Sequence, residues 1–143
     1  MSKVRSRRVF AGVVVVALAT VAVVVSQALA GAGTATAPIQ KHNSFCGADI
    51  GKGTIGWVTF KRIDKSSMRI TLEFTKALPS TKYQIFLFDG GCSVLDVTGP
   101  VQTSSSGTGK WTWTSSTFGK QSFFLDPFDG DSANDSPIVK VPG

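Results

Sequence analysis

Short runs of alternating apolar and polar residues, separated by turn residues, are the main pattern of this chain after residue 40. In residues 68–76, MRITLEFTK, the side chains of Ile70, Leu72 and Phe74 alternate with charged and hydroxyl side chains. Successive side chains of a β-strand point to opposite faces, so this alternation predicts a half-buried strand of an antiparallel sheet. No stretch after residue 40 has a sustained helical period with capping residues. The sequence therefore predicts an all-β fold.

Seven strands are predicted by such runs and by the turn residues between them. Residues 83–88, YQIFLF, are apolar on both faces, which indicates a central strand, and Gly99-Pro100 predicts a bulge or bend in the next strand. Seven short strands within about 100 residues favour a single antiparallel β-sandwich over a β-barrel. The predicted strands are residues 54–63, 68–76, 83–88, 94–103, 110–116, 121–128 and 137–141.

The first residues have the pattern of an export signal. Four positive charges precede an uncharged run rich in valine and alanine, and Ala28-Leu29-Ala30 supplies the small residues of a cleavage site. We therefore predict a signal peptide over residues 1–30, followed by a linker over 31–45 and one β-sandwich domain over 46–143. The apolar run is long enough that an uncleaved N-terminal membrane anchor, contacting the membrane only through residues 9–30, is the alternative. In both cases the domain lies outside the cell, as a secreted or an anchored module.

The basic character of the chain comes mainly from this leader. The formal net charge is +6, but without residues 1–30 it is only +2. Lys61, Arg62, Lys65 and Arg69 form a loose group around one turn, which is typical of a solvated loop and not of the clustered patch that nucleic-acid binding requires. No nucleic-acid partner is predicted.

The two cysteines, Cys46 and Cys92, are predicted to form a disulfide, because exported chains occupy compartments in which disulfides persist. Such a bridge stabilises a domain by about 4 kcal/mol in the loop-entropy model. The rival interpretation is a metal or nucleophile site that uses His42, the one histidine of the chain. Blue-copper sites need two histidines, and His42 lies in a polar approach to a strand, so this interpretation is disfavoured.

The segment ALPSTKYQIFLFDG contains a short motif of known β-sandwich domains. Pro79, Thr81 and Tyr83, followed by an alternating strand, resemble the Pro-x-Thr-x-Tyr corner of fibronectin type III and related immunoglobulin-like domains. The segments TSSSGTGKWTWT and GKQSFFL are similar to the Gly-x-Gly-x-Trp hairpin of bacterial immunoglobulin-like repeats. The resemblance implies an extracellular immunoglobulin-like module of the adhesion or binding type, with Tyr83 in a structural corner.

An acidic loop at residues 126–135, DPFDGDSAND, is the other candidate for metal binding. Calcium takes six to eight oxygen ligands, and a loop with several aspartates and a glycine can supply them. The spacing is not that of an EF-hand, and the same residue types are favoured in any polar turn, so the preferred interpretation is that no metal is bound. The alternative calcium ligands are Asp126, Asp129, Asp131, Asn134 and Asp135.

The three tryptophans are the candidate ligand-binding aromatics. Trp111 and Trp113 are two residues apart in GKWTWTSS and must share a face of the strand, for which we predict the core. Trp57 is the tryptophan expected to be exposed, because Val58 and Phe60 compete with it for the inward face of its strand. An exposed pair of indoles at positions 111 and 113, stacked on a sugar ring, is the alternative.

Taken together, these patterns predict a secreted or cell-surface module that binds a partner without catalysis. One histidine and one glutamate leave few groups for general acid–base chemistry. We expect no enzyme activity and no cofactor, and the partner is an unknown protein or polysaccharide at the cell surface. A small secreted hydrolase, or a calcium-binding protein that uses residues 126–135, is the alternative function.

Overall fold

The computed structural model describes residues 33–41 and 53–142, and all regular structure in them is β-strand. Eight strands follow one another along the chain, and the fold class predicted from the alternation is confirmed at this level. The described residues contain one strand more than the seven predicted. The strands are β1 (Thr34–Gln40), β2 (Thr54–Arg62), β3 (Ser67–Phe74), β4 (Lys82–Asp89), β5 (Val94–Gln102), β6 (Gly109–Ser116), β7 (Ser122–Phe128) and β8 (Val139–Lys140).

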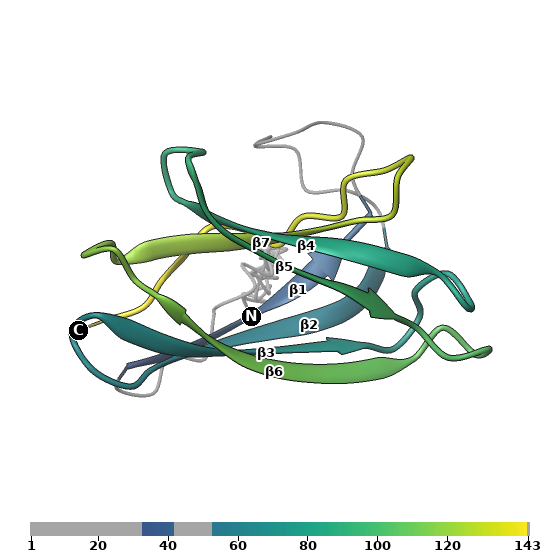
Figure 1. Cartoon of the computed structure of the whole chain (residues 1–143), viewed down its shortest axis with the longest axis horizontal. Coiled ribbons are helices and arrows are strands. Elements are labelled where there is room, and N and C mark those ends of the chain that lie inside the picture. The colour runs from purple at the N-terminus through teal and green to yellow at the C-terminus, as the bar shows by residue number, and fades with distance from the viewer. Residues whose placement is uncertain (1–32, 42–52, 143) are drawn as a thin grey trace, which may run out of the picture.

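The strands form two four-stranded antiparallel sheets that lie as two layers (Figure 1). The first sheet has the order β1-β2-β3-β6, and the second has the order β5-β4-β7-β8. The chain passes from the first sheet to the second after β3, returns at β6, and leaves again for β7. This arrangement is that of a β-sandwich.

Strand β1 lies in the segment that the sequence analysis assigns to a linker. Thr34–Gln40 pairs along its length with β2, and its inward residues Ala35, Ala37 and Ile39 are buried in the core. Small apolar residues alternate here with polar ones and with Pro38, so the period of two is present in a composition that resembles a linker. Pro38 is tolerated because β1 is an edge strand, where a missing N–H donor breaks no ladder.

The core lies between the inward faces of the two sheets. Aromatic rings connect the layers: Phe60 of β2 stacks on Phe123 of β7 with 6.2 Å between ring centroids, and Phe74 of β3 lies 4.7 Å from Tyr83 of β4. Burial of such side chains is the main stabilising contribution in a domain of this size. The buried core residues are Ala35, Ala37, Ile39, Val58, Phe60, Met68, Ile70, Leu72, Phe74, Ala77, Tyr83, Ile85, Leu87, Phe123, Leu125, Val139 and Val141.

The two sheets differ in their outer faces. In the second sheet β4 is central, as predicted from its apolar residues, and it is buried on both sides. On the outer side Phe88 is fully buried and stacks nearly parallel to the ring of Phe124, with 4.8 Å between centroids. The outer face of the first sheet has no comparable cluster among the described residues, and its outward side chains are polar, exposed or half-buried.

Two polar seams close the edges of the sandwich. At one edge the Ser115 hydroxyl of β6 donates to an Asp96 carboxylate oxygen of β5 at 2.5 Å. At the other edge Arg62 donates from Nε to the Pro142 carbonyl at 3.1 Å and from Nη2 to the Lys120 and Val141 carbonyls, both at 3.0 Å. Arg62 is thus part of the fold, held over the C-terminal segment, and does not belong to the solvated basic loop predicted for it.

Candidate functional site

The outer face of the first sheet has polar side chains aligned across all four of its strands. We call it the threonine face. Strand pairing brings its outward residues into rows that cross β1, β2, β3 and β6 in that order. One row is formed by four threonines, and a row with mixed chemistry lies on each side of it. The three rows are Pro38, Trp57, Glu73 and Lys110; Thr36, Thr59, Thr71 and Thr112; and Thr34, Lys61, Arg69 and Thr114.

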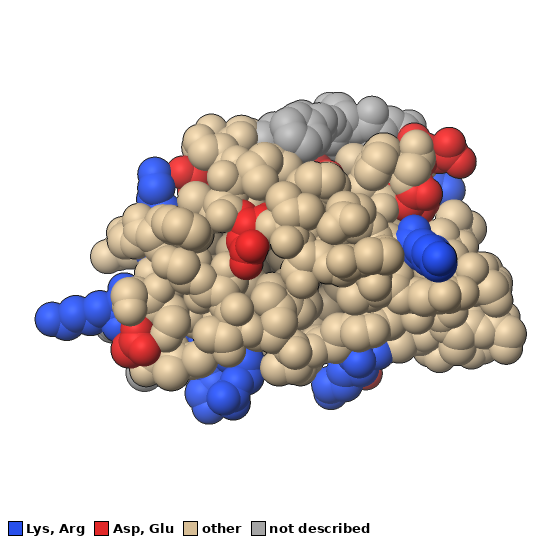
Figure 2. All heavy atoms as spheres, in the orientation of Figure 1, with Lys and Arg blue, Asp and Glu red and all other residues tan. Residues whose placement is uncertain are grey.

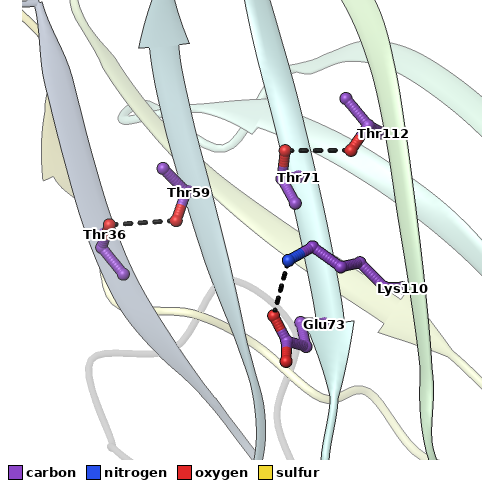
Figure 3. A network of polar contacts seen from close by, with 6 residues as sticks. All are labelled: Thr36, Thr59, Thr71, Glu73, Lys110 and Thr112. Carbon is purple, nitrogen blue, oxygen red and sulfur yellow. Dashed lines mark hydrogen bonds and ion pairs between the residues drawn. The ribbon is translucent and has the colours of Figure 1, made fainter.

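The threonine row is held by its own hydrogen bonds (Figure 3). The Oγ1 atoms of Thr36 and Thr59 lie 3.0 Å apart, and those of Thr71 and Thr112 lie 3.1 Å apart. Cross-strand threonine pairs of this kind fix the rotamers of both partners and favour the sheet. Each hydroxyl keeps unused donor or acceptor capacity, because a hydroxyl has one proton and two lone pairs. The row therefore offers ordered polar groups to a molecule lying across the strands.

Trp57 is the large aromatic side chain of the threonine face. It is 48% exposed, and it lies between Pro38 on β1 and Glu73 on β3. Its strand neighbours Val58 and Phe60 are buried in the core. Thr59, between those two, lies in the threonine row. The predicted outward orientation of Trp57 agrees with this placement. An indole held on a strand between two neighbours presents an ordered apolar surface to solvent.

Charged groups lie on both sides of the threonine row. Lys110 Nζ is 3.2 Å from a carboxylate oxygen of Glu73, and both side chains are at least half exposed (Figure 3). In the other row Lys61 and Arg69 are directly opposite each other, and both are exposed. No ion pair is found for Lys61 or Arg69 among the described residues. The net charge of the face is positive.

Trp111 and Trp113 point inward from β6, as predicted, but they are only partly buried, because β6 is an edge strand. The Trp111 ring meets Phe74 edge-on with 5.7 Å between centroids. Gly109, which has no side chain, leaves room for it, since a Cβ there would lie 2.3 Å from the indole. Of the three predicted aromatics, only Trp57 is therefore on the threonine face.

Of the corner residues, Pro79 and Thr81 lie between β3 and β4, and Tyr83 is the second residue of β4. Tyr83 is buried, and its hydroxyl accepts a hydrogen bond from the Leu78 N–H at 3.1 Å. The Thr81 hydroxyl donates to the Pro79 carbonyl at 2.9 Å. Burial raises the pKa of the Tyr83 hydroxyl. These contacts give Tyr83 an anchoring position where the chain crosses between sheets.

The acidic loop uses its oxygen atoms to hold its own backbone. Asp126 Oδ1 accepts from the Asn134 N–H at 3.1 Å, and Asp129 Oδ1 accepts from the N–H groups of Asp131 and Ser132 at 2.9 and 2.7 Å. Asn134 is buried and donates to the Pro127 and Ser132 carbonyls. Within the described residues, no group of three or more His, Cys, Asp or Glu side chains is placed to hold a metal ion. The five alternative calcium ligands, Asp135 included, are not brought together as a ligand set.

A shallow, open depression lies beside the β4–β5 turn, where Ile138 and Lys120 face Asp89. Asp89 accepts from the N–H groups of Gly91 and Ser93, and Lys120 Nζ lies 2.8 Å from its other oxygen. The Lys120 hydrogen bond, followed by the Ser93 N–H, lowers the pKa of the Asp89 carboxyl. Through these contacts Asp89 fixes the shape of the β4–β5 turn.

Several predictions concern residues outside the described part. Cys92 lies in the β4–β5 turn, but Cys46 and His42 lie outside the described residues, so the disulfide stays a prediction. The predicted signal peptide and anchor lie outside as well. Over residues 33–41 and 53–142 there is no helix that could cross a membrane.

The threonine row was not predicted from the sequence. The alternation of residues 68–76 places Thr71 outward, but its partners come from strands that are distant in sequence, and only the register of β3 with β6 aligns Thr71 with Thr112. The T-x-T pattern of TATAPIQ and KWTWTSS was the available signal. Comparison of the chain with protein-family models, with characterised proteins and with solved structures gave no match.

Proposed function

We propose that this protein is an exported, non-catalytic β-sandwich module that binds polysaccharide on the threonine face. The observation that carries the proposal is the exposed indole of Trp57 beside a hydrogen-bonded row of threonines. A sugar ring has an apolar face and a rim of hydroxyl groups. An indole can stack on the first, and ordered hydroxyls and charged groups can bind the second.

A polysaccharide suits this surface better than a protein partner does. Stable protein interfaces are centred on fully buried apolar anchors surrounded by a polar rim. The threonine face instead has one aromatic residue at its margin, and its centre is polar. The exposed surface allows a chain of sugars to lie on the indole and on the threonines of several strands.

The strand order supports an immunoglobulin-like sandwich with one added strand. With β1 set aside, β2-β3-β6 matches the A-B-E sheet of that fold, and β5-β4-β7-β8 matches its C′-C-F-G sheet. Tyr83 lies at the first crossing between sheets, in the strand that corresponds to C, whereas the tyrosine of immunoglobulin-like domains lies at the start of F. The tyrosine corner of this chain therefore resembles that of immunoglobulin-like domains but lies in a different strand.

The export signal expected in residues 1–30 agrees with a polysaccharide ligand, which would be met outside the cell. The Cys46–Cys92 disulfide expected for an exported domain would connect the β4–β5 turn to the segment after β1. Cys92 lies in the β4–β5 turn of the second sheet, and the proposed binding uses side chains of the first sheet.

The experiment is affinity electrophoresis of the protein through gels containing purified polysaccharides, namely dextran, soluble β-glucan, glycol chitin and polygalacturonate. We expect retardation by at least one of them, and loss of the retardation in Trp57→Ala. The matched control is Phe118→Ala, which removes another exposed aromatic side chain outside the face, in the β6–β7 turn. Phe118→Ala should behave as the parent. If no polysaccharide retards the protein, or if Trp57→Ala changes nothing, the proposal is wrong.

A further inference from the structure

The cationic pair on the threonine face identifies the class of polysaccharide. We infer, on the basis of the proposed function, that the ligand is an acidic polysaccharide built from uronic acids, whose carboxylates are bound by Lys61 and Arg69. The two residues are direct partners in the β2–β3 pairing, and they lie in the same row as Thr34 and Thr114, which carry no charge.

Like charges directly opposite each other on a sheet are destabilising. The other two basic residues within the strands of this sheet have compensation: Lys110 is paired with Glu73, and Arg62 donates to three backbone carbonyls. Lys61 and Arg69 have no acidic side chain within ion-pair distance in the described part of the chain. A bound carboxylate between them would remove the repulsion, and that is the charge complementarity on which the inference depends.

The surroundings of the face agree with an anionic ligand. In Figure 2 lysine and arginine side chains project from the side of the molecule on which Figure 1 places the first sheet. The outward charged residues of that sheet are three cations and one anion: Lys61, Arg69, Lys110 and Glu73. Solvent-exposed charges of one sign raise the local concentration and the association rate of ligands of the other sign.

The distance between the cationic pair and the indole selects the kind of anion. Trp57 and Lys61 are four residues apart on β2, about 13 Å along the strand, with Thr59 between them. A ligand that contacts both must present a stackable ring at one point and an anion at another. A uronic-acid polymer has both in each of its units, because the carboxylate is attached to the pyranose ring. A polyol phosphate polymer has the anion without the ring.

The geometry of Arg69 adds to this choice. A guanidinium presents parallel N–H groups that match the two oxygens of a carboxylate, and the Lys61 ammonium can approach the same group from the neighbouring strand as a point charge. The hydroxyls of the intervening threonine row are then available to the hydroxyl groups of the sugar ring between the two contacts.

The experiment compares polygalacturonate with fully methyl-esterified polygalacturonan, which has the same backbone without the charge. We expect the parent to bind polygalacturonate at least about tenfold more tightly than the ester, and the preference to decrease with added salt, because exposed charge pairs are screened. Lys61→Gln/Arg69→Gln should lose this preference and melt at the temperature of the parent or above it, because the repulsion between the two cations is removed. Lys82→Gln/Lys140→Gln, which removes two exposed charges from the second sheet, should keep the preference.

The outcomes separate this inference from the proposed function. Equal binding of both polymers, lost in Trp57→Ala, would overturn the inference and leave the proposed function intact. No binding of either polymer by the parent overturns the inference, and the wider polysaccharide panel then decides the proposed function. Tighter binding to a single-stranded oligonucleotide than to polygalacturonate would also overturn it, since basic residues beside an aromatic can bind nucleic acid.

Discussion

The tryptophans of the first sheet that point inward contribute to the core, and the one that points outward belongs to the proposed binding surface. Substituting them one at a time should therefore separate effects on stability from effects on binding. Trp111 contacts Phe74 and covers Gly109 at the edge of the core. We expect Trp111→Ala to lower the free energy of unfolding by about 3 kcal/mol, the lower end of the range for large aromatic residues in cores, because the side chain is only partly buried. Urea denaturation measures the change.

Trp57→Ala is the control for this prediction. Its indole is about half exposed and lies outside the core cluster, so its removal should change the free energy of unfolding by less than about 1 kcal/mol. Equal losses of stability in the two variants would contradict the assignment of Trp57 to a binding surface. A neutral Trp111→Ala would contradict the assignment of Trp111 to the core.

At the residue scale, the sequence predicts the direction of a side chain well and its neighbours poorly. Competition with Val58 and Phe60 is enough to place Trp57 outward, and spacing is enough to place Trp111 and Trp113 together. The pairing of Lys61 with Arg69 is hidden in the sequence, where the two residues flank a turn and look like part of a solvated loop. Only the β2–β3 register places them opposite each other on a sheet face.

At the element scale, the β2–β3 turn is ordered by one carboxylate. Asp64 accepts from the N–H groups of Ser66 and Ser67, both at 2.8 Å, and from both of their hydroxyls. These bonds, with the Ser67 hydroxyl contributing most, lower the pKa of Asp64 from 3.8 to about 2. A carboxyl whose pKa is lower in the folded chain stabilises the fold above its unfolded pKa, and the contribution is lost as the pH falls.

The resulting prediction concerns Asp64→Asn. The parent should be more stable than this variant at pH 6, and the difference should decrease as the pH falls from about 4 to about 2. Ser67→Ala removes the hydroxyl that contributes most to the lowered pKa of Asp64. In this variant the pKa of Asp64 should lie closer to its unfolded value, so the pH range over which stability is lost should be narrower. Thermal unfolding followed by circular dichroism at several pH values measures both effects. A difference between parent and Asp64→Asn that stays constant over the range would contradict the assignment.

Strand β1 is the element that sequence reasoning missed, for a physical reason. Alanine and proline are poor strand formers, and TATAPIQ has no large apolar residue before Ile39, so its intrinsic preference for β-structure is weak. Pairing with β2 stabilises the strand in spite of this weak preference, because every residue of β1 lies opposite a residue of β2. The other seven elements have larger apolar residues, and their boundaries agree with the prediction to within a few residues.

At the scale of the whole molecule, the two sheets are used differently. The second sheet buries aromatic side chains on its outer face as well as in the core, whereas the first sheet leaves its outer face to threonines, charges and one indole. Alternation along single strands predicts such a division for each strand separately. The threonine face combines the outward residues of four strands. Which residues become neighbours on it depends on strand order and register, and these follow only from the fold.

The disulfide is the prediction that concerns the whole domain. Cys92 occupies the turn after β4 in a left-handed backbone conformation, and Asp89 holds that turn through the N–H groups of Gly91 and Ser93. A bridge from there to Cys46 would close a loop that includes β2, β3 and β4, and it would restrict the unfolded chain by about 4 kcal/mol in the loop-entropy model. For a domain of about 100 residues, this corresponds to a decrease in melting temperature of at least several degrees on reduction.

Mass spectrometry of the unreduced protein, prepared by export from the cell, should therefore give a peptide pair linking Cys46 to Cys92. Thermal unfolding with and without reductant measures the contribution to stability, and Cys46→Ser/Cys92→Ser should melt like the reduced parent in both conditions. Binding by the threonine face should survive reduction at temperatures where the domain stays folded, because neither cysteine lies in its rows. Two free thiols in the exported protein would show that the domain reaches its stability from the two-sheet core alone.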